Sequence, residues 1–229
     1  MKDLGHLKYF LGLEVACSAE GFYLCQRKYC TDVVTEVGIL VCKPAGFPMD
    51  KRHGVSLAKG SPFPDPERYR RLVGRLVYLA ATRPDLTYSI HILTQFMQKL
   101  DNAHWDGAMH VVRYLKGTLG QGIMLREAPP LHITGWSDSD WEGCPVTQRS
   151  LTGWLVQLGT SIISWKTKKQ GTVALSSTEA EYRPMTEAVE ELKWIKGLLR
   201  DCGIDHTRPM TLMCDDQSAN LLDQESCFP

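Results

Sequence analysis

Three acidic residues, far apart in the sequence, have the types and contexts that suit metal-ion chemistry. Asp138 follows an apolar run, Glu181 stands near the start of a helical pattern, and Asp215 ends another apolar run. Carboxylates at such element ends can meet at one edge of a sheet, where their oxygens suit hard cations such as Mg²⁺. Two Mg²⁺ ions about 4 Å apart can activate a water and stabilise the leaving oxygen of a phosphodiester. These residues therefore predict a two-metal site that cleaves phosphodiesters.

Each acid also has a purely structural interpretation. Asp138 is then a turn aspartate and Asp215 an N-cap. Glu181 is then the N3 partner in a capping box whose N-cap is Thr178. Any one acid alone favours the structural interpretation, whereas their joint occurrence in one order of elements favours the metal site.

The elements that must position these acids are a sheet and one long helix. Apolar alternation predicts strands at 122–126, 133–137, 152–158, 161–166, 172–175 and 210–214. The Gly159-Thr160 pair predicts a tight turn in an antiparallel meander, and Gly203 a helix end. A right-handed crossover through the helix would lay strand 210–214 parallel beside strand 133–137. That topology would bring the three acids together.

The preceding part of the chain predicts a hairpin and four helices. Two apolar runs around a turn at 18–21 indicate the hairpin, and residues 29–40 have helical spacing. A connector rich in proline and glycine, 44–66, leads to helical patterns at 67–81, 84–100 and 102–117. We therefore expect an α/β chain of the α+β kind, with domains at 1–120 and 121–229.

Composition narrows the function classes. The 229 residues are 43% hydrophobic and 23% charged, which is typical of a packed globular protein. Basic and acidic residues balance to a net charge of zero, so only local basic clusters can indicate a nucleic-acid partner. The eight cysteines form no C-x-x-C pair, which favours reduced thiols inside a cell over disulfides or zinc. No apolar run reaches the roughly 18 residues of a membrane span, so no membrane partner is expected.

Two local basic clusters could contact nucleic acid. One is the arginine face of the predicted helix 67–81, which could instead be a solvated helix face. The other is a basic run that contains a tryptophan, suited to phosphate contact and base stacking, or a solvated hairpin end. The predicted contacts are Arg70, Arg71, Arg75, Trp165, Lys166, Lys168 and Lys169.

Several long motifs follow one another in one order. They are YFLGLEV at 9–15, QRKY at 26–29, YRRLVGRLVYL at 69–79, TRPDL at 82–86 and RYLKGT at 113–118. With the region from Trp136 onward, they resemble the end of the Pol polyprotein of Ty1/copia-type LTR retrotransposons. The resemblance covers nearly all of the chain. Its first part is similar to the thumb and connection after a reverse-transcriptase palm, and its second part to a ribonuclease H domain.

The resemblance implies a role in copying element RNA into DNA. It implies Mg²⁺-dependent cleavage of the RNA strand of an RNA–DNA hybrid, and on the family pattern Asp138, Glu181 and Asp215 are the first three catalytic carboxylates. The implied partners are an RNA–DNA hybrid or RNA template and the rest of the Pol polyprotein. The implied location is a cytoplasmic virus-like particle or the nucleus.

Several departures from the family pattern weaken the expectation of activity. The palm motif with the polymerase aspartates is absent, and the last strand and helix of the ribonuclease H fold, with a fourth acid, are expected to be missing. An incomplete two-metal site leaves two alternatives to an enzyme, namely an inactive retroelement relic and a non-catalytic nucleic-acid-binding module. Pro184 replaces the usual alanine, and at position N6 after Thr178 it should kink the helix or cost roughly 3 kcal/mol. Further departures are Glu142, Val146, Gln148 and Asp216.

Overall fold

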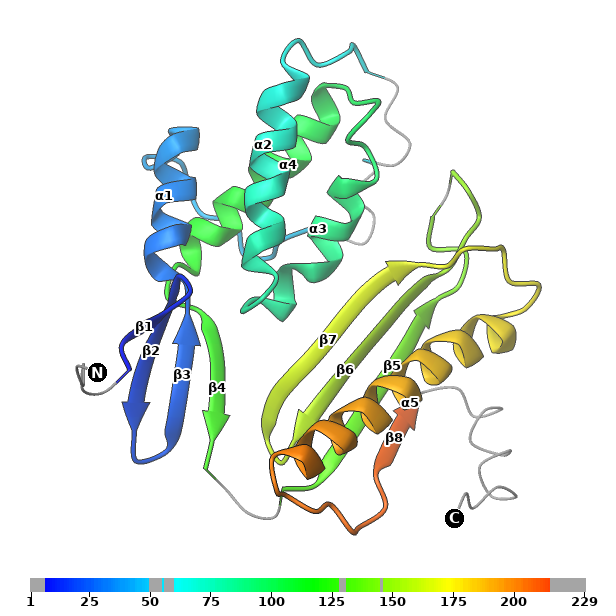
Figure 1. Ribbon diagram of the computed structural model, residues 1–229. Coiled ribbons are helices and arrows are strands. Elements are labelled where there is room, and N and C mark those ends of the chain that lie inside the picture. The colour runs from blue at the N-terminus through cyan, green and yellow to red at the C-terminus, as the bar shows by residue number, and fades with distance from the viewer. Residues whose placement is uncertain (1–6, 50–54, 56–59, 128–130, 145, 215–229) are drawn as a thin grey trace. The chain divides into compact units, whose positions relative to one another are not determined.

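The protein forms two compact units, Met1–Met124 and Leu125–Pro229 (Figure 1). The structure is a computed structural model that describes residues 7–49, 55, 60–127, 131–144 and 146–214. Within these residues it contains two four-stranded sheets and five α-helices. This mixed composition confirms the expected α+β class in its general form.

The sheet of the first unit begins with the predicted hairpin. Its strands are β1 (Tyr9–Phe10), β2 (Leu13–Ser18), β3 (Gly21–Cys25) and β4 (Gly122–Arg126), in the order β1-β2-β3-β4. The hairpin prediction is confirmed, because β2 and β3 pair antiparallel up to Ser18 opposite Gly21. Strand β4 has the predicted bounds but joins this sheet instead of the strands that follow it. Gly122 permits that pairing, because a side chain there would overlap the carbonyl of Leu24.

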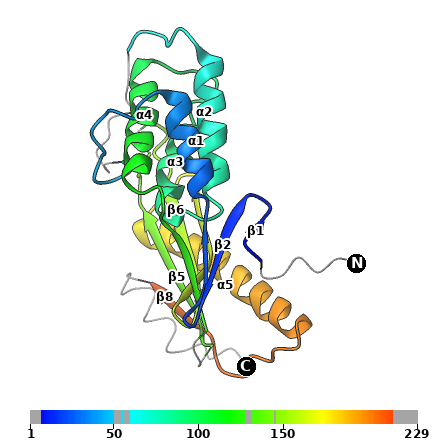
Figure 2. The same ribbon diagram turned by 90° about the vertical axis from the view of Figure 1, so that its left-hand side faces the viewer.

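The helices of the first unit pack around one apolar core. They are α1 (Arg27–Val37), α2 (Pro66–Leu79), α3 (Thr87–Thr94) and α4 (Asn102–Gly117), and α1, α2 and α4 lie side by side in both views (Figure 1 and Figure 2). The side chains of Leu76, Leu93 and Leu115 are fully buried in this core. The helix predicted over 84–100 is wrong in extent. It begins as a short 3₁₀ turn and ends at Thr94, where the amides of Gln95 and Phe96 bond three residues back.

Arg83 is a buried polar centre of this unit. Its side chain is 1% exposed, and its guanidinium donates to both carboxylate oxygens of Asp85 at 2.9 and 2.7 Å. The same guanidinium donates to the carbonyl and hydroxyl oxygens of Thr118 at 3.0 and 2.8 Å. Arg83 therefore connects the turn before α3 to the end of α4. This gives the TRPDL segment, with Arg83 and Asp85, and the KGT segment, with Thr118, a structural role in the first unit.

The second unit is one sheet crossed by one helix. Its strands are β5 (Ile133–Asp140), β6 (Leu151–Leu158), β7 (Ser161–Lys169) and β8 (Thr211–Cys214), in the order β7-β6-β5-β8. Strands β5, β6 and β7 pair antiparallel, and β8 lies parallel to β5. This confirms both the predicted meander and the predicted crossover. The crossover helix α5 (Ser177–Asp201) lies across one face of the sheet (Figure 1), with Leu192 and Ile195 in the core.

Two predictions for this unit are wrong. No strand forms over residues 172–175, because β7 continues to Lys169 and the Gln170 amide then bonds to the carbonyl of Ser150. The N-cap of α5 is Ser176 instead of Thr178. The Ser176 hydroxyl accepts from the amide of Glu179 at 3.1 Å, and a Glu179 oxygen accepts from the amide of Leu175 at 2.8 Å.

Because the N-cap is Ser176 and not Thr178, Glu181 and Pro184 stand two residues further into α5 than predicted. Glu181 is the fifth helical residue instead of N3, so its carboxylate is not part of a capping box. Pro184 is the eighth helical residue instead of N6, and α5 continues through it to Asp201.

Two further observations concern the whole of the described part. Its seven cysteines carry free thiols. No helix in it is both long enough and apolar enough to cross a membrane.

Candidate functional site

Helix α5 presents the Glu181 carboxylate to the backbone of β5. The Glu181 side chain is 7% exposed, and its Oε1 accepts a hydrogen bond from the backbone nitrogen of Ser139 at 3.1 Å. Ser139 directly follows Asp138 in the strand. Two of the three predicted acids are therefore brought to the same position along β5, from elements 42 residues apart at the contact.

Asp138 lies within β5 and its side chain is exposed. The prediction that it follows the strand is wrong, because β5 continues to Asp140. Burial alternates along β5, and a side chain at Gly135 would contact Leu192 of α5 at 3.1 Å, so the buried face is the one that α5 covers. Asp138 is on the opposite, exposed face, and Glu181 approaches the strand from the helix side.

The third predicted acid, Asp215, lies outside the described residues. The last described residue of β8, Cys214, pairs in parallel with Ser137, one position before Asp138. Among the described residues, no three His, Cys, Asp or Glu side chains come together as a metal site. The structure therefore describes two of the three predicted acids, Asp138 and Glu181.

The loop after β5 is tied closely to Asp140. The Gly143 amide donates to the Asp140 carbonyl at 3.0 Å, and a Cβ at Gly143 would lie 2.7 Å from an Asp140 carboxylate oxygen. Further along the loop, the Cys144 thiol is buried. Burial alone would raise the pKa of Cys144, but hydrogen bonds from Thr147 and the positive charge of Lys169 outweigh it and lower that pKa. A side chain at position 143 would therefore require Asp140 to shift.

Gln170 supports the turn of α5 that carries Glu181, and the sequence reasoning missed it. Its side chain is 5% exposed, and its Nε2 donates to the Thr152 hydroxyl at 3.2 Å and to the Ala180 carbonyl at 2.9 Å. Ala180 directly precedes Glu181. No periodicity or spacing in the sequence marks Gln170, because both partners come from other elements. Ser176 was also missed, although Ser176 and Glu179 have capping-box spacing.

The predicted basic run with Trp165 is the C-terminal end of β7, at the open end of the hairpin that β7 forms with β6. Lys166 and Lys168 are on the α5 side, where their ammonium groups lie 3.2 and 3.9 Å from the carboxylate of Glu187. Trp165 and Lys169 belong to the other face of the strand, because side chains alternate along it. The run is therefore split between two faces, and its contact with nucleic acid stays a prediction.

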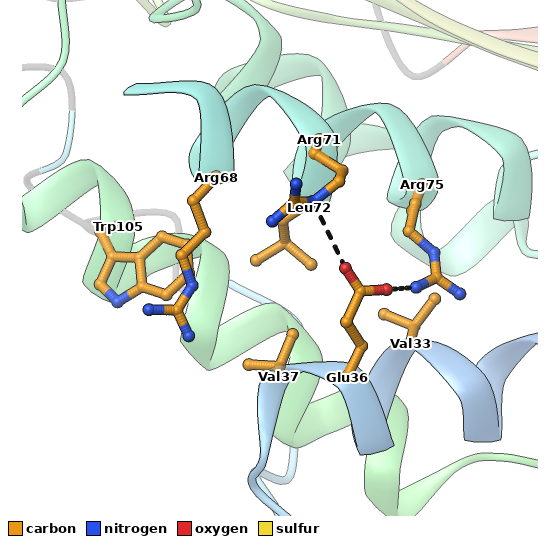
Figure 3. Close-up of a pocket in the computed structure, with 8 residues that line it drawn as sticks. All are labelled: Val33, Glu36, Val37, Arg68, Arg71, Leu72, Arg75 and Trp105. Atoms are coloured by element: carbon orange, nitrogen blue, oxygen red, sulfur yellow. Dashed lines mark ion pairs between the residues drawn. The ribbon is translucent and has the colours of Figure 1, made fainter. Parts of the chain in front are cut away.

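The predicted arginine face of α2 makes contacts within the first unit. Glu36 of α1 pairs with Arg75 and, at 3.4 Å, with Arg71, as Figure 3 shows. These three side chains line a small pocket of about 40 Å³. Arg70 donates from Nε to the carbonyl of Met97 at 2.8 Å. Nucleic-acid contact by these arginines also stays a prediction.

Comparison with known proteins places the chain among retrotransposon polyproteins. No protein-family model matches it. It is 40% identical over 222 residues to the retrovirus-related Pol polyprotein from transposon RE2 of Arabidopsis thaliana, which covers 97% of this chain and 15% of that protein. It is 32% identical over 238 residues to the retrovirus-related Pol polyprotein from transposon TNT 1-94 of Nicotiana tabacum, which covers 100% of this chain and 18% of that protein.

A shorter relative matches over most of its own length. An uncharacterized mitochondrial protein of Arabidopsis thaliana is 41% identical over 194 residues, which covers 85% of this chain and 80% of that protein. The chain thus spans less than a fifth of the two polyproteins but most of this relative.

Proposed function

Because this chain belongs to the family of Ty1/copia-type retrotransposon Pol polyproteins, we propose that its second unit is the ribonuclease H segment of such a polyprotein. The proposed reaction is hydrolysis of the RNA strand in RNA–DNA hybrids during reverse transcription. Water attacks a phosphorus atom of the RNA, and the bond from that phosphorus to the 3′ oxygen breaks. The 3′ oxygen leaves with a proton, and the new end keeps the phosphate.

The contact between Glu181 and Ser139 carries this proposal. It sets the buried carboxylate of Glu181 against the backbone of β5 at Ser139, the residue after Asp138, whose exposed carboxylate is on the opposite face of the strand. The parallel pairing of β8 adds support, because it sets Cys214 opposite Ser137. Asp215 is the next residue in the sequence and would supply the third carboxylate.

The available donors fit Mg²⁺ by chemistry. All three residues offer carboxylate oxygens, which hard cations prefer, and no sulfur or nitrogen ligand is needed. When bound, Mg²⁺ would activate the attacking water and stabilise the leaving oxygen. Asp138, Glu181 and Asp215 would hold the metal. The hydrogen bond from the Ser139 amide to Oε1 holds the Glu181 carboxylate against β5.

The test uses a matched pair of substitutions on one strand. The purified chain is incubated with Mg²⁺ and a labelled RNA–DNA hybrid, as wild type, Asp138→Asn, Glu181→Gln and the control Asp140→Asn. Asp140 is an exposed carboxylate two residues from Asp138 on the same face of β5. We expect cleavage to be lost in the first two variants and retained in the control.

The same substitutions are repeated in a chimera in which this chain replaces the matching segment of the RE2 polyprotein. The chimera supplies the rest of a polyprotein, so it decides the outcome if the chain alone does not cleave. Equal cleavage by Asp138→Asn and Asp140→Asn, or a folded chimera without cleavage, would reject the proposal. Hybrid binding without cleavage would indicate a non-catalytic binding module.

A further inference from the structure

We propose that the C-terminal half of α5 and the turn after it form a phosphate-binding surface for a nucleic-acid strand. The surface consists of Lys193, Lys196 and Arg200, with His206 and Thr207 from the turn. It is distinct from the carboxylates and from the basic residues predicted from the sequence. The proposal rests on the proposed function, in which this unit handles RNA–DNA hybrids.

The three cations share one face of the helix. Positions i, i+3 and i+7 lie on the same side of an α-helix, and all three side chains are exposed. Leu192 and Ile195, which directly precede Lys193 and Lys196, are buried against the sheet. The face is therefore held in place by the core of the unit.

Three other cations of this unit are paired within it. Lys166 and Lys168 contact Glu187, and Arg183 contacts Glu179 at 2.7 Å. By contrast, Lys193, Lys196 and Arg200 form no ion pair with any residue that the structure describes. Cations that form no ion pair keep their charge available to an external anion.

The cations border a hollow that suits a phosphate group. A cavity of about 280 Å³ lies between α5 and the turn at 205–207, and Asp205 is the one acid among its lining residues. Three cations against one carboxylate leave a positive charge there. Since one water occupies about 30 Å³, the space takes a phosphate group with bridging waters.

The wall of this hollow is fixed by hydrogen bonds. Gly203 has φ of +79°, its amide donates to the Arg200 carbonyl, and the Ile204 amide donates to the Leu199 carbonyl, each at 2.9 Å. This is a Schellman end, which turns the chain sharply back toward the helix. The His206 Nε2 accepts from the Ile133 amide at 3.4 Å and so connects the turn to β5. A preformed wall lowers the entropy lost on binding.

A polynucleotide fits this surface better than a free anion. Glu181 and Lys193 are separated by about 18 Å along the helix, since each residue rises about 1.5 Å. A strand of a duplex advances about 3.4 Å per nucleotide, so one hybrid can span both sites about five nucleotides apart.

The test measures how hybrid binding depends on salt. The full chain is titrated with a short RNA–DNA hybrid without Mg²⁺, over a series of salt concentrations. The variant is Lys193→Gln/Lys196→Gln/Arg200→Gln, and the control is Lys8→Gln/Lys28→Gln/Lys43→Gln, which removes the same charge from exposed sites of the first unit. We expect the slope of log K against log[salt] to become less steep by about 2 to 3 in the variant only.

The outcomes separate this proposal from the catalytic one. An unchanged slope, an equal change in the control, or no hybrid binding by the wild type would overturn it. A lower melting temperature with unchanged binding would show that the three cations pair within the chain, which also overturns it. If the triple variant does not fold, the single variants Lys193→Gln and Lys196→Gln should each change the slope by about 1. Cleavage that requires Asp138 but not this surface would retain the proposed function and reject only this inference.

Discussion

The side-chain amide of Gln170 donates a hydrogen bond to the backbone carbonyl of Ala180 across 2.9 Å. In a regular helix that carbonyl would accept from the amide four residues later, which is position 184. Pro184 has no amide hydrogen, so the helix itself cannot satisfy the Ala180 carbonyl. Gln170 therefore supplies the donor that Pro184 removes, one residue before Glu181.

This relationship predicts a coupling between Gln170 and Pro184. Gln170→Ala should lower the free energy of unfolding by about 1–3 kcal/mol, because it leaves a buried carbonyl without a donor. In a Pro184→Ala background the helix regains its own donor, so the same substitution should cost less by about 1 kcal/mol. Urea denaturation of the four chains of this double-mutant cycle measures the difference. Strictly additive effects would show that the two residues do not share the Ala180 carbonyl.

Pro184→Ala alone should raise the melting temperature, because α5 runs through this position. We expect a gain smaller than the roughly 3 kcal/mol of an ordinary helix interior. Gln170 already satisfies the carbonyl, and the buried proline ring leaves a small cavity when it is removed. Thermal unfolding measures the change, and an unchanged or lower melting temperature would contradict the prediction.

The N-cap of α5 can be tested with two neighbouring hydroxyl residues. Ser176→Ala should lower the free energy of unfolding by about 1 kcal/mol, because the Glu179 amide loses its acceptor. Thr178→Ala, inside the helix, should have an effect within about 0.5 kcal/mol. Chemical denaturation compares the two, and a larger effect at Thr178 would restore it as the N-cap.

Glu179 should make this unit sensitive to acid. The Leu175 amide and the Arg183 guanidinium hold the pKa of Glu179 below its ordinary value of 4.5. Because the folded state favours the charged form, the stabilisation is present above pH 4.5 and is lost as pH falls through the lowered pKa. Melting temperatures measured from neutral pH downward should therefore fall less steeply for Glu179→Gln than for the wild type. Glu190→Gln, an exposed control on the same helix, should keep the wild-type slope.

Arg83 should be the most sensitive charged residue of the first unit. Arg83→Ala should lower the free energy of unfolding by about 3–5 kcal/mol, because it leaves Asp85 and Thr118 without their buried partner. The control Arg71→Ala removes an ion pair whose arginine side chain is 65% exposed and should cost about 0–1 kcal/mol. Urea denaturation measures both, and similar losses would contradict the prediction.

Local sequence signals placed most elements correctly, and the errors have identifiable causes. The hairpin, α1, α2, α4 and the crossover to β8 follow from periodicity, caps and chain connection, which depend on nearby residues. Strand β4 was predicted with its observed bounds. Its pairing with β3 could not be predicted from nearby residues, because β3 is almost a hundred residues earlier in the sequence. The cap of α5 was ambiguous because two overlapping segments both match a capping box.

The sequence by itself determined the family and most of the order of elements, because motifs and local patterns are written in adjacent residues. It also predicted the three acids as a site. Only the tertiary structure decided how some of those residues are used. Glu181 bonds to Ser139 because α5 crosses β5 there, and Ser176 is the helix cap because its hydroxyl accepts from the amide of Glu179. In the same way Gln170 meets Ala180 only after the chain has folded. Such contacts depend on how distant elements pack, which spacing along the chain cannot specify.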